Sequence, residues 1–132
     1  MKVLVIEDNE LNLRLASDIL KTRGYDVFEA RDADTGIAIA RKELPHLVLM
    51  DVQLPGMDGL AATKVLKGDE KTRHIKIIAF TAFAMKGDRD QILEAGCDGY
   101  ISKPFKLDEF IETIESAGVP AKKTGSSERE SS

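Results

Sequence analysis

The stretch LVLMDVQLPGMDG at residues 47–59 contains the pattern that decides the fold. Four apolar residues, Leu47 to Met50, run without interruption up to Asp51, and a loop rich in Pro and Gly follows. A short apolar run bounded by turn residues is typical of a strand that is buried on both faces of a parallel sheet. The stretch therefore predicts a buried strand with a carboxylate at its carboxyl end.

Similar strand and helix patterns flank this stretch on both sides. The predicted strands are residues 3–6, 27–30, 47–50, 75–80 and 99–102. A first helix is predicted between Asn9 and Gly24, and the others at about 34–43, 60–66, 86–95 and 107–117. In the first helix, Leu11, Leu15 and Ile19 fall on one apolar stripe. Strands that alternate with helices of this length imply βαβ units and a parallel sheet.

The composition fits one soluble domain that needs no disulfide. The 132 residues are 42% hydrophobic and 32% charged, with a net charge of −4. No apolar run approaches the roughly 18 residues of a membrane span, and the negative charge argues against direct nucleic-acid binding. The single cysteine, Cys97, is expected to be buried and fits a reducing, cytoplasmic location. Residues 1–118 are predicted to form the domain, and the polar residues 119–132 a disordered tail.

Polar side chains follow the predicted strands at the points where the strands end. They are Glu7 and Asp8, Asp51, Thr81 and Lys103. In open α/β sheets, ligands bind at the carboxyl edge, where these strand ends meet. Any one of these residues alone would more often be a helix cap, but five together argue against caps alone. Three clustered carboxylates repel one another unless a cation intervenes, and oxygen ligands suit Mg²⁺ or Mn²⁺. A site of this kind fits a phosphoryl substrate and an aspartate nucleophile, while P-loop and GxGxxG motifs are absent from the sequence.

Four segments together resemble a receiver domain of two-component response regulators over residues 2 to about 117. They are VLVIEDN at 3–9, LVLMDVQLPGMDG at 47–59, IIAFTA at 77–82 and AGCDGYISKPF at 95–105. The resemblance implies a doubly wound, five-stranded parallel sheet of order 2-1-3-4-5 with helices on both faces, as in flavodoxin-like and CheY-like folds. The strand pattern alone predicts five units but not their order.

The resemblance also implies a phosphorylation site. Asp51 matches the phosphoacceptor, and Glu7 and Asp8 match the acidic pair that positions Mg²⁺, with Asp8 as the direct ligand. Lys103 matches the lysine that pairs with the phosphoryl group, and Pro104 matches a proline that follows a cis peptide bond.

Five further positions match residues that modulate the site or transmit its state. The backbone carbonyl of Gln53 matches the third protein ligand of the metal. Thr81 and Tyr100 match the switch hydroxyl and the switch aromatic, and Ala82 is small where the phosphoryl group enters. Gln53 and Phe83 flank the path of the hydrolytic water, so a bulky Phe83 is expected to prolong the phosphorylated state.

These matches predict a stand-alone receiver of the CheY and DivK type, since no output domain follows the last helix. A histidine kinase or histidine phosphotransfer protein would phosphorylate Asp51. The surface of helix 86–95, strand 99–102 and helix 107–117 would then bind a downstream effector. The protein is expected to be a signalling switch rather than an enzyme with a small-molecule product. Three alternatives stay open: a phosphorelay intermediate, a receiver from a hybrid histidine kinase, and an unmodified scaffold of receiver shape.

Overall fold

Five parallel strands form a single sheet in the order β2-β1-β3-β4-β5. This computed structural model describes residues 1–54, 56–82 and 86–117. The strands are β1 (Lys2–Ile6), β2 (Asp26–Ala30), β3 (Leu47–Asp51), β4 (Lys76–Thr81) and β5 (Gly99–Ser102). The strand order implied by the resemblance is therefore confirmed. Phe83 and the predicted tail at 119–132 lie outside the described residues.

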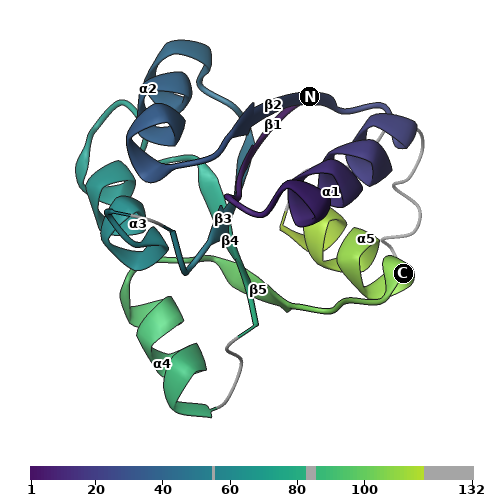
Figure 1. Ribbon diagram of the computed structural model, residues 1–132. Coiled ribbons are helices and arrows are strands. Elements are labelled where there is room, and N and C mark those ends of the chain that lie inside the picture. The colour runs from purple at the N-terminus through teal and green to yellow at the C-terminus, as the bar shows by residue number, and fades with distance from the viewer. Residues whose placement is uncertain (55, 83–85, 118–132) are drawn as a thin grey trace.

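Helices cover both faces of the sheet (Figure 1). They are α1 (Glu10–Thr22), α2 (Ala33–Glu43), α3 (Gly59–Gly68), α4 (Lys86–Glu94) and α5 (Leu107–Ser116). Helices α1 and α5 lie on one face, and α2, α3 and α4 lie on the other. Predicted and observed boundaries of the strands and of α2 to α5 agree within two residues. Among the described helices, none has the length and apolar character that crossing a membrane would need.

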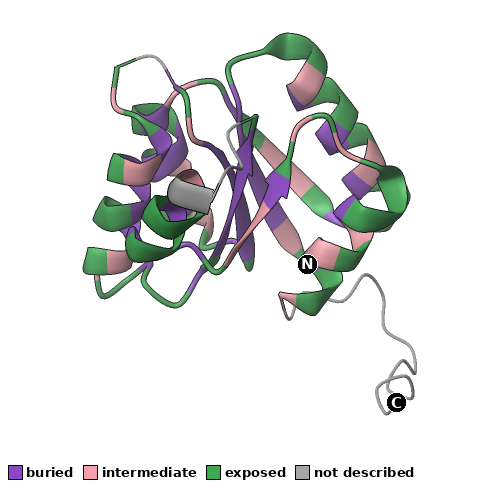
Figure 2. Cartoon of the chain, turned by 90° about the horizontal axis from the view of Figure 1, so that it is seen from below, coloured by how far each residue is buried: buried purple, intermediate pink, exposed green. Residues whose placement is uncertain are grey.

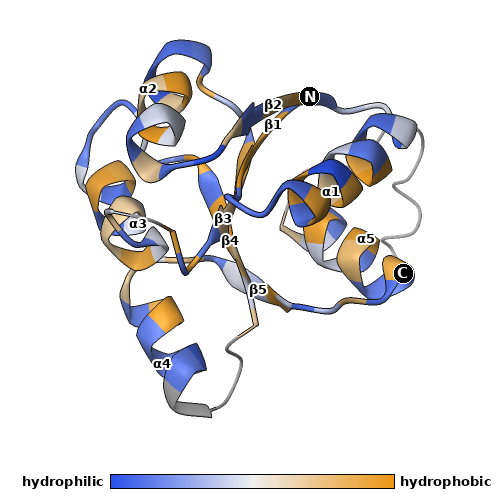
Figure 3. Cartoon of the chain, in the orientation of Figure 1, coloured by the Kyte–Doolittle hydropathy of each residue, from blue (hydrophilic) through white to orange (hydrophobic). Residues whose placement is uncertain are grey.

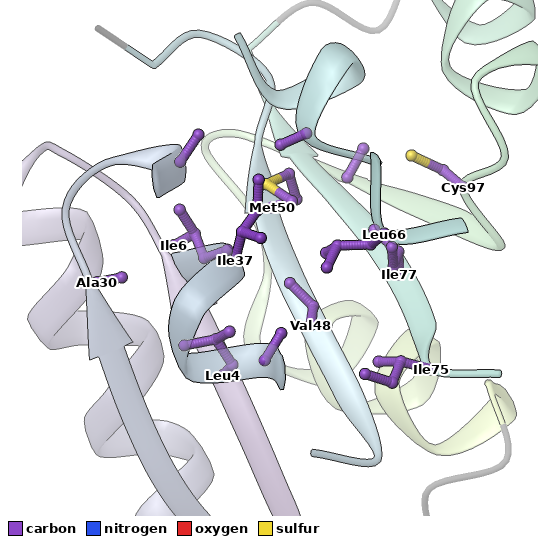
Figure 4. Close-up of a cluster of buried hydrophobic side chains, with 14 of the residues drawn as sticks. Leu4, Ile6, Ala30, Ile37, Val48, Met50, Leu66, Ile75, Ile77 and Cys97 are labelled. Carbon is purple, nitrogen blue, oxygen red and sulfur yellow. The ribbon is translucent and has the colours of Figure 1, made fainter. Parts of the chain in front are cut away.

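The core has two layers because successive strand side chains point to opposite faces. On β3, Leu47 and Leu49 pack toward α1 and α5, whereas Val48 and Met50 pack toward α2 and α3. Figure 4 shows the second layer, and Figure 2 shows buried residues concentrated in the sheet, with exposed residues on the outer sides of the helices. The hydropathy colouring of Figure 3 follows the same division. Every residue of β3 is buried, as the uninterrupted apolar run predicts.

The apolar stripe predicted in the first helix is wrong for two of its three residues: Ile19 is partly buried against the core, but Leu11 and Leu15 are not. Leu11 and Leu15 are 74% and 46% exposed, whereas Leu13, Ala16 and Leu20 are buried against β1, β3 and α5. Both sets follow the spacing of a helical face, so periodicity alone could not decide between them. The smaller Ala16 is on the inner face, where it allows α1 to approach the sheet closely.

Candidate functional site

The register of the strands aligns the site residues along the carboxyl edge of the sheet. Ile6 pairs with Met50 and Asp51 pairs with Phe80, so Glu7, one residue beyond β1, lies next to Asp51. Glu7 and Asp51 are 0% and 4% exposed. Side-chain alternation directs both toward the face that α1 and α5 cover. Two carboxylates thus lie side by side in the protein interior.

A third carboxylate completes the cluster. One oxygen from each of Glu7, Asp8 and Asp51 lies within 4.8 Å of the others, and Asp8 is exposed to solvent. All three donors are oxygens, and an exposed carboxylate leaves one side of the site open. This donor set fits Mg²⁺ or Mn²⁺, which take oxygen ligands and keep several waters. Among the described residues, these three are the ones that could hold such an ion, together with the backbone near Gln53.

Lys103 reaches across the sheet to this cluster. Its Nζ lies 2.9 Å from Glu7 Oε1 and 3.6 Å from Asp51 Oδ1. The other Glu7 oxygen accepts a hydrogen bond from the backbone N–H of Asn9 at 3.0 Å. The peptide bond between Lys103 and Pro104 is cis, as the resemblance implied. The lysine therefore places one positive charge between two buried carboxylates.

Burial and crowding raise the pKa of Asp51 to about 7. Loss of solvation is the largest cause, and the neighbouring Glu7 carboxylate raises the pKa further. The Lys103 ammonium and the Gln53 N–H, which donates to Asp51 Oδ1 at 3.0 Å, lower it in part. In the metal-free protein, burial and the Glu7 carboxylate thus outweigh the Lys103 ammonium and the Gln53 N–H, and they favour the neutral form of Asp51.

The amino end of α3 fixes the backbone beside Asp51. The Asp58 carboxylate caps α3 by accepting from Ala61 N–H at 2.8 Å, and Gly59 N–H donates to Val52 O at 2.9 Å. A Cβ built at Gly59 would overlap the carbonyl oxygen of Asp51. Sequence reasoning placed Gly59 only in a turn, because a close backbone approach leaves no signal beyond the glycine itself.

The residues matched to the switch, Thr81 and Tyr100, lie on the opposite face of the sheet from the Asp51 side chain. Thr81 is buried at the end of β4, and Ala82 beside it is exposed. Tyr100 pairs in register with Ala79, two residues before Thr81, so alternation places Thr81 and Tyr100 on the α4 side. The Tyr100 ring is half-buried, with the Arg89 guanidinium carbon 5.8 Å from its centroid. The two residues therefore share one face of the sheet.

A second residue near the site was also missed by sequence reasoning. Phe80 is fully buried and lies between Asp51 and Ile101 in the register of the sheet. The Lys103 Nζ lies 4.9 Å from the centroid of its ring. In the sequence, Phe80 reads as an ordinary strand residue, because its position depends on which strands are neighbours.

Comparison with known proteins identifies the family. The family model of the response regulator receiver domain matches residues 3–115. The chain belongs to this family. The receiver domain is 50% identical over 114 residues to the polar-differentiation response regulator DivK of Brucella ovis, across 86% of this chain and 93% of that protein.

Two solved structures agree with this assignment. One is the receiver domain of the sensor histidine kinase PA1611 from Pseudomonas aeruginosa, with a magnesium ion coordinated in its active site cleft. It aligns with a TM-score of 0.82 and 35% identity, over 89% of this chain and 97% of that chain. The chemotaxis protein CheY4 of Vibrio cholerae shares the fold, with a TM-score of 0.83 and 24% identity over 88% and 97% of the two chains. The predicted family and fold are thus confirmed, and the receiver domain is a signalling protein of two-component systems.

Proposed function

We propose that this receiver domain accepts a phosphoryl group on Asp51 from a phosphohistidine of a histidine kinase or a histidine phosphotransfer protein. The observation that best supports this proposal is the buried Asp51 carboxylate, which has a lysine ammonium 3.6 Å away and two further carboxylates beside it. An Asp51 oxygen attacks phosphorus, the bond between phosphorus and the imidazole nitrogen breaks, and its electron pair stays on that nitrogen.

The surrounding residues have separate tasks in this reaction. Glu7, Asp8, Asp51 and the Gln53 carbonyl would hold Mg²⁺ or Mn²⁺, which when bound offsets negative charge on the phosphoryl oxygens. Glu7 directs the Lys103 ammonium toward Asp51, as their 2.9 Å ion pair indicates. That ammonium would pair with a phosphoryl oxygen in the phosphorylated protein.

Four more residues take the roles that the resemblance assigned. The Thr81 hydroxyl would donate to the new phosphoryl group, and the small Ala82 would leave room for that group. Gln53 and Phe83 would flank the water that hydrolyses the aspartyl phosphate. Apart from its own phosphorylation and dephosphorylation, the domain would catalyse no reaction.

The output we propose is a change of the surface formed by α4, β5 and α5. Thr81 and Tyr100 lie on the α4 side of β4 and β5, so a movement of Thr81 toward a phosphoryl group changes the space beside Tyr100. This change would control binding of a downstream effector protein in the cytoplasm. The 50% identity to DivK, a response regulator by name, supports a stand-alone regulator.

A relay role is the second candidate, because the receiver of a sensor histidine kinase is 35% identical. In a relay or a hybrid kinase, Asp51 would pass its phosphoryl group to a histidine, and Tyr100 would not be needed. A Tyr100→Ala variant separates the two roles. We expect it to exchange phosphoryl groups normally and to lose effector binding, whereas a pure relay would show no defect.

The proposed chemistry is tested by intact mass after incubation with acetyl phosphate and Mg²⁺. We expect one phosphoryl adduct, which is lost in an Asp51→Asn variant and in the presence of a chelator. Fluoroberyllate, which mimics a phosphoryl group, should bind the wild-type protein under the same conditions. Absence of both the adduct and the fluoroberyllate complex would overturn the proposal and leave a scaffold of receiver shape.

A further inference from the structure

Lys103 can reach Asp51 only by crossing β4. In the sheet, β4 lies between β5, which precedes Lys103, and β3, which ends at Asp51. Neighbouring strands are about 4.8 Å apart, so roughly 10 Å separates the backbones of β3 and β5, and the side chains of Lys103 and Asp51 bridge this distance together. The residue in its path is Phe80, which pairs in register with Asp51 on one side and Ile101 on the other.

The Phe80 ring forms a fixed support under the ammonium. Its centroid lies 4.9 Å from Lys103 Nζ, and the lysine side chain is only 16% exposed. Two further rings hold it in place: Phe105 at 5.7 Å and Phe110 at 6.3 Å, which themselves stack at 4.7 Å. The negative face of an aromatic ring attracts a cation, and does so more strongly where solvent is partly excluded.

We propose that Phe80 is a positioning residue for phosphoryl transfer, because its ring face holds the Lys103 ammonium at the carboxylate oxygens of Glu7 and Asp51. The inference rests on the proposed function, in which Lys103 pairs with the phosphoryl group. An aliphatic side chain at position 80 would fill the core but would offer the ammonium no negative face. A flexible lysine would then sample other rotamers, and fewer molecules would be ready to react.

The contact itself can be tested without metal or phosphoryl donor. In NMR spectra of the metal-free protein, the ε-protons of Lys103 should lie upfield of those of the exposed Lys64, because of the Phe80 ring current. In Phe80→Leu they should move to the position of Lys64. Resonances of Lys103 that match those of Lys64 in the wild type, or that Phe80→Leu leaves unchanged, would overturn the proposed contact.

The effect on chemistry is tested with a ring that keeps its shape. Replacing Phe80 by 3,4,5-trifluorophenylalanine withdraws electron density from the ring face but keeps the shape of the ring. This variant therefore preserves the packing of the core and can be used even if Phe80→Leu folds poorly. We expect phosphorylation by acetyl phosphate to slow by about 3- to 30-fold, from the usual range of cation–π attraction. The matched control is the same replacement at Phe110, which is equally buried and packs edge-on against Phe80 at 6.3 Å.

The controls separate this inference from the proposed function. The control at Phe110 should stay within about 2-fold of wild type, since the ring that the Lys103 ammonium contacts is that of Phe80. A wild-type rate with fluorinated Phe80, or equal slowing at both positions, would overturn the positioning role. Failure of the wild-type protein to form either the phosphoryl adduct or the fluoroberyllate complex would instead contradict the proposed function, while the NMR comparison would still test the contact.

Discussion

Replacing Asp51 by Asn should stabilise the metal-free protein at pH 8, although it removes the proposed phosphoacceptor. The folded state raises the pKa of Asp51 from its ordinary value of 3.8 to about 7. Each pKa unit corresponds to about 1.4 kcal/mol, so ionising Asp51 in the folded protein costs about 4 kcal/mol above pH 7. Asn has no charge to bury, and its side-chain oxygen can still accept from Gln53 N–H, as Asp51 does at 3.0 Å. We expect a gain of about 2–4 kcal/mol in the free energy of unfolding.

The pH dependence gives this prediction its sign. Well below pH 3.8, Asp51 is protonated in both the folded and the unfolded state, so its titration contributes no difference in stability. Between about pH 4 and 7 the unfolded chain releases the proton while the folded protein retains it, so wild-type stability falls as pH rises. The advantage of Asp51→Asn should therefore be near zero at pH 4 and complete above pH 7. Urea denaturation of both proteins in chelator, from pH 4 to pH 8, measures it.

Two controls sharpen the experiment. Mg²⁺ should stabilise the wild type and remove most of the difference at pH 8, because the ion neutralises the carboxylate cluster. Asp69→Asn should not stabilise, since hydrogen bonds from Lys71 N–H and from Arg41 lower the pKa of Asp69. The reasoning would be refuted if Asp51→Asn were no more stable than wild type at pH 8, or if its gain were equally large at pH 4.

Three further predictions concern residues around the site and the core. Gly59→Ala should cost about 2 kcal/mol or more in thermal or urea denaturation, because its Cβ overlaps the Asp51 carbonyl. The control Gly68→Ala, with open space around its Cβ, should be neutral or stabilising by up to about 1 kcal/mol; equal effects would contradict the close approach. Lys67→Met should lower the free energy of unfolding by about 1–2 kcal/mol, because the Lys67 Nζ donates to Ile75 O at 2.8 Å and to Asp98 Oδ2 at 3.0 Å. An unchanged midpoint of urea denaturation would contradict this prediction. Burial raises the pKa of the Cys97 thiol, so a thiol reagent should react far more slowly with native than with urea-unfolded protein, and equal rates would show that the thiol is accessible.

The sequence was sufficient to predict the strands and the edge where chemistry collects. Strands β1, β3 and β4 are largely short apolar runs, and the runs that end at Asp51 and Thr81 place polar groups at the carboxyl edge. The order of the strands could not be predicted in this way, because periodicity carries no information about which strands are neighbours. The order 2-1-3-4-5 came only from the resemblance to receiver domains.

The residues that sequence reasoning missed depend on that order. Phe80 lies under Lys103 only because β4 separates β3 from β5. Gly59 matters only because α3 begins against the backbone of Asp51. The prediction that Leu11 and Leu15 face the core was wrong for another reason. Two faces of α1 have apolar residues at helical spacing, and the face that contains the small Ala16 is the one that packs against the sheet.

The ion pair between Glu7 and Lys103 joins residues that are 96 positions apart in the chain. A chain that is still being synthesised carries Asp51 long before it carries the lysine that faces it. Until Lys103 has left the ribosome and β5 has docked, the aspartate lacks its opposing charge. Nascent chains and truncated products that end before residue 103 therefore lack the lysine of the proposed site, even though they already carry its three carboxylates.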